Sequence, residues 1–173
     1  MRRTHALLIA LSLCLAACQQ RASPPAASSP GAAPTASPAI ILPAPVKPAD
    51  ALASHNTNWA GVVADVTEFR RRGNVLTALV RLRNVLTGGH IIVQFSVGGV
   101  YLMDEAGAKK YELLKDEKGD YIASSTGLFT EAVDSGAGVT LWMKFPAPPL
   151  ETKTATLAVP QMPPFEDLPI QDQ

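Results

Sequence analysis

Cys18 is the residue of this 173-residue chain best placed for covalent chemistry, since it follows Leu15-Ala16-Ala17 and precedes Gln19. A cysteine directly after small residues and a short apolar run is typical of a thiol that receives diacylglycerol. Cleavage before that cysteine then frees an amino group for a fatty acid such as palmitate. Because each buried methylene contributes about 0.8 kcal/mol, two or more acyl chains hold a protein firmly on a membrane. The pattern predicts a lipid anchor on Cys18.

The residues before Cys18 have the composition of a signal peptide. After Arg2 and Arg3 comes a largely apolar run of ten residues, from Ala6 to Leu15. It is too short for a membrane span, which needs about 20 residues, but it suits a secretion signal. The stretch ending in Cys18 resembles the lipobox of bacterial lipoproteins, so residues 1–17 are expected to be removed. An ordinary secretory signal with a chance cysteine is the alternative. Gln19 favours the outer membrane over inner-membrane retention, with the domain in the periplasm or at the cell surface.

Charge and cysteine content exclude some classes of protein. The chain has 15 basic and 15 acidic residues, and removal of Arg2 and Arg3 with the signal leaves 13 basic against 15 acidic. A nucleic-acid partner is not expected, because it would require a basic patch or a high pI. The second cysteine, Cys14, lies in the signal, so the mature chain is expected to fold on its core without a disulfide.

Three segments are predicted along the chain: a signal peptide at 1–17, a lipidated cysteine and disordered linker at 18–57, and a domain at 58–173. The linker is rich in Pro, Ala and Ser and has few charged residues. Such a composition cannot bury enough apolar surface to offset the entropy lost on ordering. We therefore expect a tether between the membrane and the domain.

Apolar and polar residues alternate in the domain, and this period of two predicts half-buried strands. In one run Leu76 and Val80 face inward while Arg81 and Arg83 face outward, and in another Lys144 faces outward. The expected strands are Ala60–Phe69, Leu76–Leu82, Ile91–Val97, Val100–Met103, Lys110–Leu114, Tyr121–Ala123, Val139–Phe145 and Ala155–Val159. The proline-rich segment 163–170 is expected to cap one sheet edge. Seven to eight strands without helical periodicity predict an all-β fold, an antiparallel immunoglobulin-like β-sandwich, with a small closed barrel as the alternative.

Three segments carry a resemblance to a known family. They are Leu79-Val80-Arg81-Leu82-Arg83-Asn84, the stretch from Leu102 to Tyr111 with its Asp104-Glu105-Ala106-Gly107 turn, and Val139 to Pro146. In order and spacing they resemble the extracytoplasmic immunoglobulin-like domains of the DUF4352 type over roughly residues 60–160. The resemblance implies an immunoglobulin-like sandwich in a surface or envelope protein, and it implies little chemistry.

Residues for catalysis or metal binding are sparse. Outside the signal the histidines are His55 and His90, with no His-x-x-x-His or Cys-x-x-Cys spacing, so no metal site or cofactor is expected. Ser124 or Ser125 with His90 as base would be the most plausible hydrolase arrangement, although no Gly-x-Ser-x-Gly turn surrounds either serine. An enzyme is therefore the least favoured class.

Arg70-Arg71-Arg72 and Trp142 are the candidate interaction residues. The arginines could meet an anionic surface or form a solvated hairpin tip, and Trp142 could anchor an interface or pack in the core. The favoured hypothesis is a membrane-anchored, non-catalytic binding or scaffold module for a protein or envelope polymer. The alternative is a periplasmic domain that binds a small ligand or lipid in an apolar pocket lined by Phe95, Tyr101 and Trp142.

Overall fold

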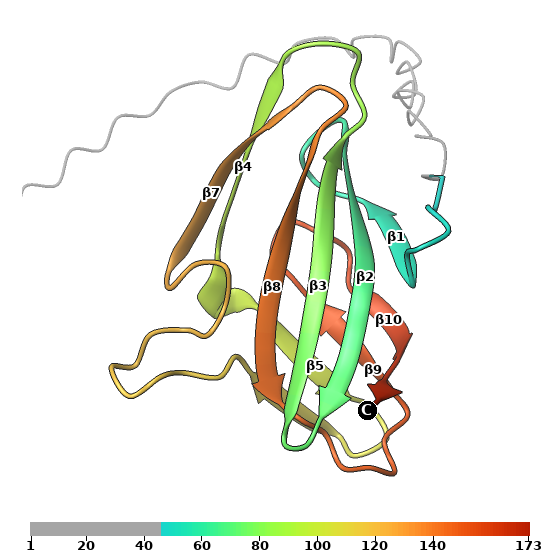
Figure 1. Ribbon diagram of the computed structural model, residues 1–173, viewed down its shortest axis with the longest axis vertical. Helices are drawn as coiled ribbons and strands as arrows, with labels where there is room; N and C mark the ends of the chain where they lie inside the picture. Colours follow the sequence, from blue (N-terminus) through green and yellow to red (C-terminus); the bar gives the residue numbers. More distant parts are fainter. Residues whose placement is uncertain (1–45) are drawn as a thin grey trace, which may run out of the picture. The chain divides into compact units, whose positions relative to one another are not determined.

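A computed structural model describes residues 46–173 of the chain (Figure 1). Cys18, the predicted signal peptide and most of the predicted tether lie outside the described residues. The described part contains eleven strands and one short 3-10 turn. Residues 46–173 include no helix that is long and apolar enough to cross a membrane.

The strands form two main sheets and a separate two-stranded ribbon. The first sheet has the order β1 (Ala53–Asn56), β2 (Val62–Arg72), β3 (Val75–Asn84) and β8 (Gly138–Pro146), with β11 (Gln171–Asp172) also paired to β2. The second sheet has the order β10 (Phe165–Pro169), β9 (Thr154–Ala158), β5 (Tyr101–Asp104) and β6 (Lys109–Glu112). The ribbon pairs β4 (His90–Ser96) with β7 (Leu128–Asp134). All pairs are antiparallel except β11 with β2.

One hydrophobic core lies between the sheets, and the second sheet is seen behind the first in Figure 1. Strand β3 alternates strictly, with Leu76, Ala78, Val80 and Leu82 fully buried, as the period of two predicted. Burying each large aliphatic or aromatic side chain stabilises the fold by about 1.5–3 kcal/mol. The all-β antiparallel sandwich predicted from the sequence is confirmed.

Strand β1 lies inside residues 18–57, which were predicted to be linker. It pairs with β2 from Ala53 to Asn56. The Ser54 hydroxyl donates a hydrogen bond to Asp65 at 2.6 Å, and the His55 ring packs against Phe165 with centroids 4.9 Å apart. The first sheet therefore begins before residue 58, and long-range contacts hold a segment whose own composition is weakly strand-forming.

The other differences concern short or irregular strands. Strands β7, β10 and β11 were not predicted, while the expected strand at Tyr121–Ala123 forms only isolated bridges to Lys115 and Met143. Segment 163–170 supplies β10, which pairs with β9 at the edge of the second sheet, in agreement with the expected cap. The strand count of seven to eight was thus too low.

Candidate functional site

The three adjacent arginines do not form one surface cluster, because successive residues of β2 face opposite sides of the sheet. Arg70 and Arg72 face outward, whereas the Arg71 side chain is only 2% exposed. Its guanidinium donates to the backbone carbonyls of Pro148, at 2.9 Å, and of Pro149, and its Nε donates to Asp172 at 2.7 Å. A solvated hairpin tip is therefore wrong for Arg71, which joins β2 to the loop before β9 and to β11.

The ion pair between Arg71 and Asp172 makes stability depend on pH in the acid range. The Arg71 hydrogen bond, helped by Lys153, holds the pKa of Asp172 below its ordinary value of 3.8. Because the folded-state pKa is depressed, the contribution of Asp172 is fully present above 3.8 and is lost as pH falls through the lower folded value. We expect the stability difference between wild type and Asp172→Asn, measured by urea unfolding, to be constant well above pH 3.8 and to shrink as pH falls below 3.8. A difference that persists unchanged at acid pH would contradict this assignment.

Outward side chains of β2, β3 and β8 align in rows across the first sheet. One row is Arg70, Thr77 and Lys144, because Thr77 pairs with both of the others. The next row is Glu68, Leu79 and Trp142. Neighbouring strands lie about 4.8 Å apart and successive rows about 6.8 Å apart. The register therefore places a basic row beside a row of one carboxylate, Glu68, and two apolar side chains, Leu79 and Trp142.

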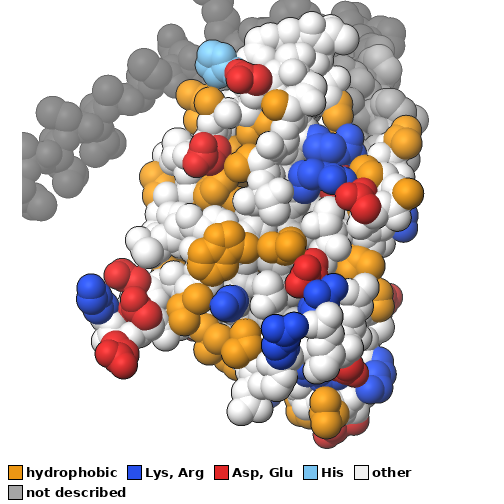
Figure 2. Space-filling model, in the orientation of Figure 1, with side chains coloured by type: hydrophobic (Ala, Val, Ile, Leu, Met, Phe, Trp, Pro, Cys, Tyr) orange, Lys and Arg blue, Asp and Glu red, His pale blue; other side chains and the backbone are white. Residues whose placement is uncertain are grey.

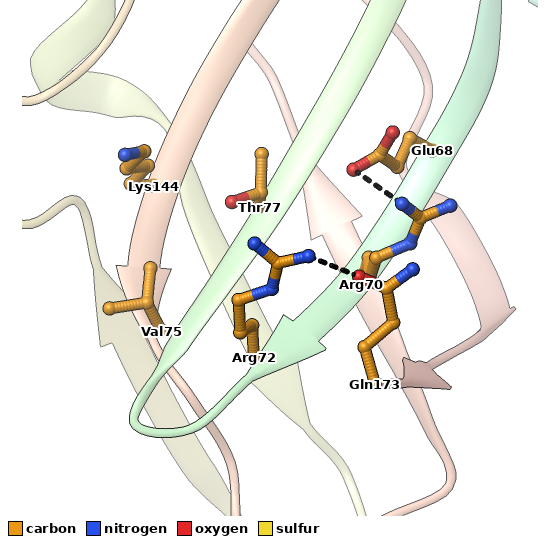
Figure 3. A pocket seen from close by; sticks show the side chains of 7 residues that line it. All are labelled: Glu68, Arg70, Arg72, Val75, Thr77, Lys144 and Gln173. Atoms are coloured by element: carbon orange, nitrogen blue, oxygen red, sulfur yellow. Dashed lines mark hydrogen bonds and ion pairs between the residues drawn. The ribbon is translucent and has the colours of Figure 1, made fainter.

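A depression of about 470 Å³ lies over the basic row (Figure 3). Its lining side chains are Glu68, Arg70 and Arg72 from β2, Val75 and Thr77 from β3, Lys144 from β8, and Gln173. We call this site the basic depression, since its side chains carry three positive charges and one negative.

The positive charges of the basic depression are weakly compensated. The Arg70–Glu68 ion pair is long, at 3.8 Å, and Arg72 donates to the neutral amide oxygen of Gln173 at 2.7 Å. Within residues 46–173, Lys144 has no acidic partner within ion-pair distance. An excess of positive charge thus remains available to an anionic ligand.

A second group of arginines on the same face is neutralised by its neighbours. Arg83 binds Asp65 through two hydrogen bonds, and Arg81 binds Asp50 through two, at 3.0 and 3.1 Å. The hydrogen bond from Arg81 also lowers the pKa of Asp50. Two positive charges face two negative ones here, so this group has no excess charge to offer.

Trp142 faces outward and is 40% exposed, which decides between the two orientations that the sequence left open. It lies beside Leu79, with Leu141 and Met143 buried on the other side of the sheet. Figure 2 shows a band of hydrophobic side chains on this face between two groups of Lys and Arg side chains. The face thus combines an apolar shelf, Leu79 and Trp142, with the basic depression.

The structure does not bring the hydrolase candidates together. His90 begins β4 opposite Asp134, whereas Ser125 bonds to Leu128 at the other end of the ribbon. Six residues of strand separate these ends, or about 20 Å, far beyond hydrogen-bond reach. The Ser124 hydroxyl accepts from the Trp142 backbone N–H at 2.7 Å.

The predicted apolar pocket does not form from the expected residues. Phe95 lies in the core, Trp142 faces outward on the first sheet, and Tyr101 lies under Lys110 on the second sheet. Residues 46–173 contain no group of three or more His, Cys, Asp or Glu side chains arranged to hold a metal ion.

Comparison of the chain with protein-family models, with curated proteins and with solved structures gave no match. The resemblance to DUF4352-type domains therefore stays a prediction.

The sequence indicated Arg70, Arg72 and Trp142 as candidate interaction residues and predicted that Lys144 faces outward. It did not predict that these side chains lie together in one site. Thr77 and Glu68 were not singled out. The missing signal is the pairing of β3 with both β2 and β8, which brings residues 70 and 144 to either side of Thr77.

Proposed function

We propose that this protein is a non-catalytic binding module held on the envelope membrane by lipid on Cys18. The module presents the outer face of β2, β3 and β8 to an envelope protein or polymer. The observation that carries the proposal is the basic depression beside an exposed tryptophan on a sheet face that stays accessible, with Arg70 35% and Trp142 40% exposed. Exposed aromatic residues and arginines are the side chains that most often dominate binding energy at interfaces.

The predicted anchor and tether support a role at a distance from the membrane. A proline-rich segment as long as the predicted linker, residues 18–57, reaches on the order of 100 Å when extended. A domain on such a tether searches a large volume, and its concentration near envelope components is raised by attachment. A binding site of modest affinity would then be enough to keep the domain bound to its envelope partner.

Replacing Cys18 with alanine tests the anchor. Wild-type protein is expected in the detergent phase with the mass of attached lipid, because multiple acyl chains anchor firmly. Cys18→Ala is expected in the aqueous phase without that mass. Phase partitioning with mass spectrometry measures both, and an unlipidated wild-type protein would remove the anchor from the proposal.

Photo-crosslinking in intact cells tests the binding face. A photoreactive residue in place of Thr77, inside the basic depression, is expected to give a cross-linked product, discrete for a protein partner and heterogeneous in mass for a polymer. The matched control replaces Glu112, an exposed residue of β6 on the second sheet. Equal patterns from both positions, or none from Thr77, would count against binding through the outer face.

A further inference from the structure

The basic depression and the apolar shelf are adjacent, and together they define a ligand of mixed chemistry. Arg70 and Lys144 flank Thr77 on neighbouring strands, so the two cations start from backbones about 10 Å apart with a hydroxyl between them. An anionic group placed over Thr77 would receive a hydrogen bond from the hydroxyl and attraction from both sides. Charge-assisted contacts of this kind are stronger than neutral ones.

Trp142 lies one row away, on the same strand as Lys144 and two residues before it. Its exposed indole offers a flat apolar surface, as the C–H face of a sugar ring requires, and leaves polar groups in water. One row spans about 6.8 Å, the scale of a single sugar ring. A sugar stacked on Trp142 therefore directs an acidic substituent, its own or its neighbour's, toward the basic depression.

We propose that the outer face binds an acidic polysaccharide, a chain of sugars that carries carboxylate or phosphate groups. This inference rests on the proposed function as a binding module and names the ligand class. A bare polyanion would use the cations alone and leave Trp142 without a role. An anionic lipid surface would gain only about 1 kcal/mol per basic residue, on a face whose other half, with Asp50 and Asp65, carries no excess charge.

Binding of defined polymers to detergent-solubilised full-length protein tests the inference. The probes are polygalacturonate, phosphomannan, the uncharged methyl ester of polygalacturonate, and inorganic polyphosphate. We expect binding of at least one of the two acidic polysaccharides and, for that polymer, a preference over polyphosphate and over any uncharged glycan. Comparison of the two acidic polymers assigns carboxylate or phosphate as the anionic group.

Variants separate the two halves of the site. Arg70→Gln/Lys144→Gln is expected to weaken binding about tenfold and to reduce its salt dependence. Trp142→Ala is expected to weaken it about tenfold, as loss of a stacking platform does, while Trp142→Phe retains most affinity. The matched control, Lys109→Gln/Lys110→Gln on the second sheet, removes two exposed positive charges and is expected to leave binding unchanged. Melting temperatures confirm that each variant is folded.

Three results would overturn the inference. Polyphosphate bound as tightly as the acidic glycans, with Trp142→Ala unaffected, would reduce the site to a charge patch. Equal binding of the methyl ester would remove the role of the cations. If no glycan binds but a protein is cross-linked at Thr77, the ligand class is overturned and the proposed function stands. If no glycan binds and Thr77 gives no cross-link, the ligand class and the proposed function are both overturned.

Discussion

Arg71→Ala is expected to lower the free energy of unfolding by about 3 kcal/mol, although it removes the middle one of three adjacent arginines. The buried guanidinium hydrogen-bonds to four backbone carbonyls, of Pro148, Pro149, Leu150 and Thr152, and to the Asp172 carboxylate. Without it, the carbonyls of Pro148 and Thr152 lose a partner at buried positions. Leaving such groups unsatisfied costs about 1–3 kcal/mol each.

Arg70→Ala and Arg72→Ala are the matched controls for Arg71→Ala. Both side chains face outward on the same strand, so each control is expected to change stability by less than about 0.5 kcal/mol. Arg71→Lys is expected to fall in between, because an ammonium keeps the charge but lacks the planar fork of donors. Urea unfolding measures all four variants. Equal destabilisation by the three alanine variants would show that the Arg71 contacts add nothing to the fold.

The alternation of side chains in β3 and β8 could be predicted from the sequence, although the face on which Trp142 lies was left open. Leu76 to Leu82 and Leu141 to Phe145 alternate strictly, and one buried face fixes which residues point inward. The same reasoning placed Lys144 outward. Local periodicity suffices here because each strand is long and has one apolar face.

Pairing between distant segments could not be predicted. Strand β1 has the sequence Ala-Ser-His-Asn and becomes a strand only because β2 supplies its hydrogen bonds and Phe165 packs on His55. Strand β7 has only Phe129 and Val133 buried, too few for a recognisable period. In both cases contacts far along the chain override weak local propensity.

Arg71 shows how a compositional pattern can mislead. Three consecutive arginines resemble a solvated cluster, yet a period of two places the middle one on the side of Phe69, in the core. Its partners lie 77 to 81 residues away in the loop and 101 residues away at Asp172. The periodicity was visible in the sequence, but these partners were not.

The candidate site depends on residue types, which the sequence shows, and on strand pairing, which only the structure shows. Arg70, Arg72 and Trp142 were identified by residue type, whereas their arrangement comes from the pairing of Leu79 with Trp142 and of Thr77 with Arg70 and Lys144. A shift of one residue in either register would move Trp142 or Lys144 to the core face. The buried alternation of β3 therefore stabilises the site as well as the fold.

Asp65→Ala is expected to lower the free energy of unfolding by about 2–3 kcal/mol. The Asp65 side chain lies on the outer face but is fully covered, and it accepts hydrogen bonds from Ser54 and Arg83 and pairs with Arg81 at 3.5 Å. Its removal leaves two arginines without their shared anion. Both are 28% exposed, so water compensates in part and the loss stays below that of a wholly buried pair.

Asp50→Ala is the control for Asp65→Ala, since Asp50 also pairs with Arg81 but is 62% exposed. Its removal is expected to cost less than about 1 kcal/mol. The double variant Asp65→Ala/Arg83→Ala is expected to be about as stable as Asp65→Ala alone, because residues in one network are not additive. Urea unfolding of wild type, Asp65→Ala, Arg83→Ala and the double variant measures this coupling, and losses that add would contradict a shared network.

Removal of Asp65 also changes the charge of the binding face. With Asp65 gone, Arg83 loses its carboxylate, and the half of the face that was neutral gains an excess positive charge. If the outer face binds acidic polysaccharide, Asp65→Ala is expected to bind polyphosphate more tightly while its preference for polygalacturonate falls. Such a change would show that neutralisation of Arg81 and Arg83 restricts anion binding to the half of the face where Trp142 adjoins the basic depression. An unchanged preference would mean that this half of the face does not influence selectivity.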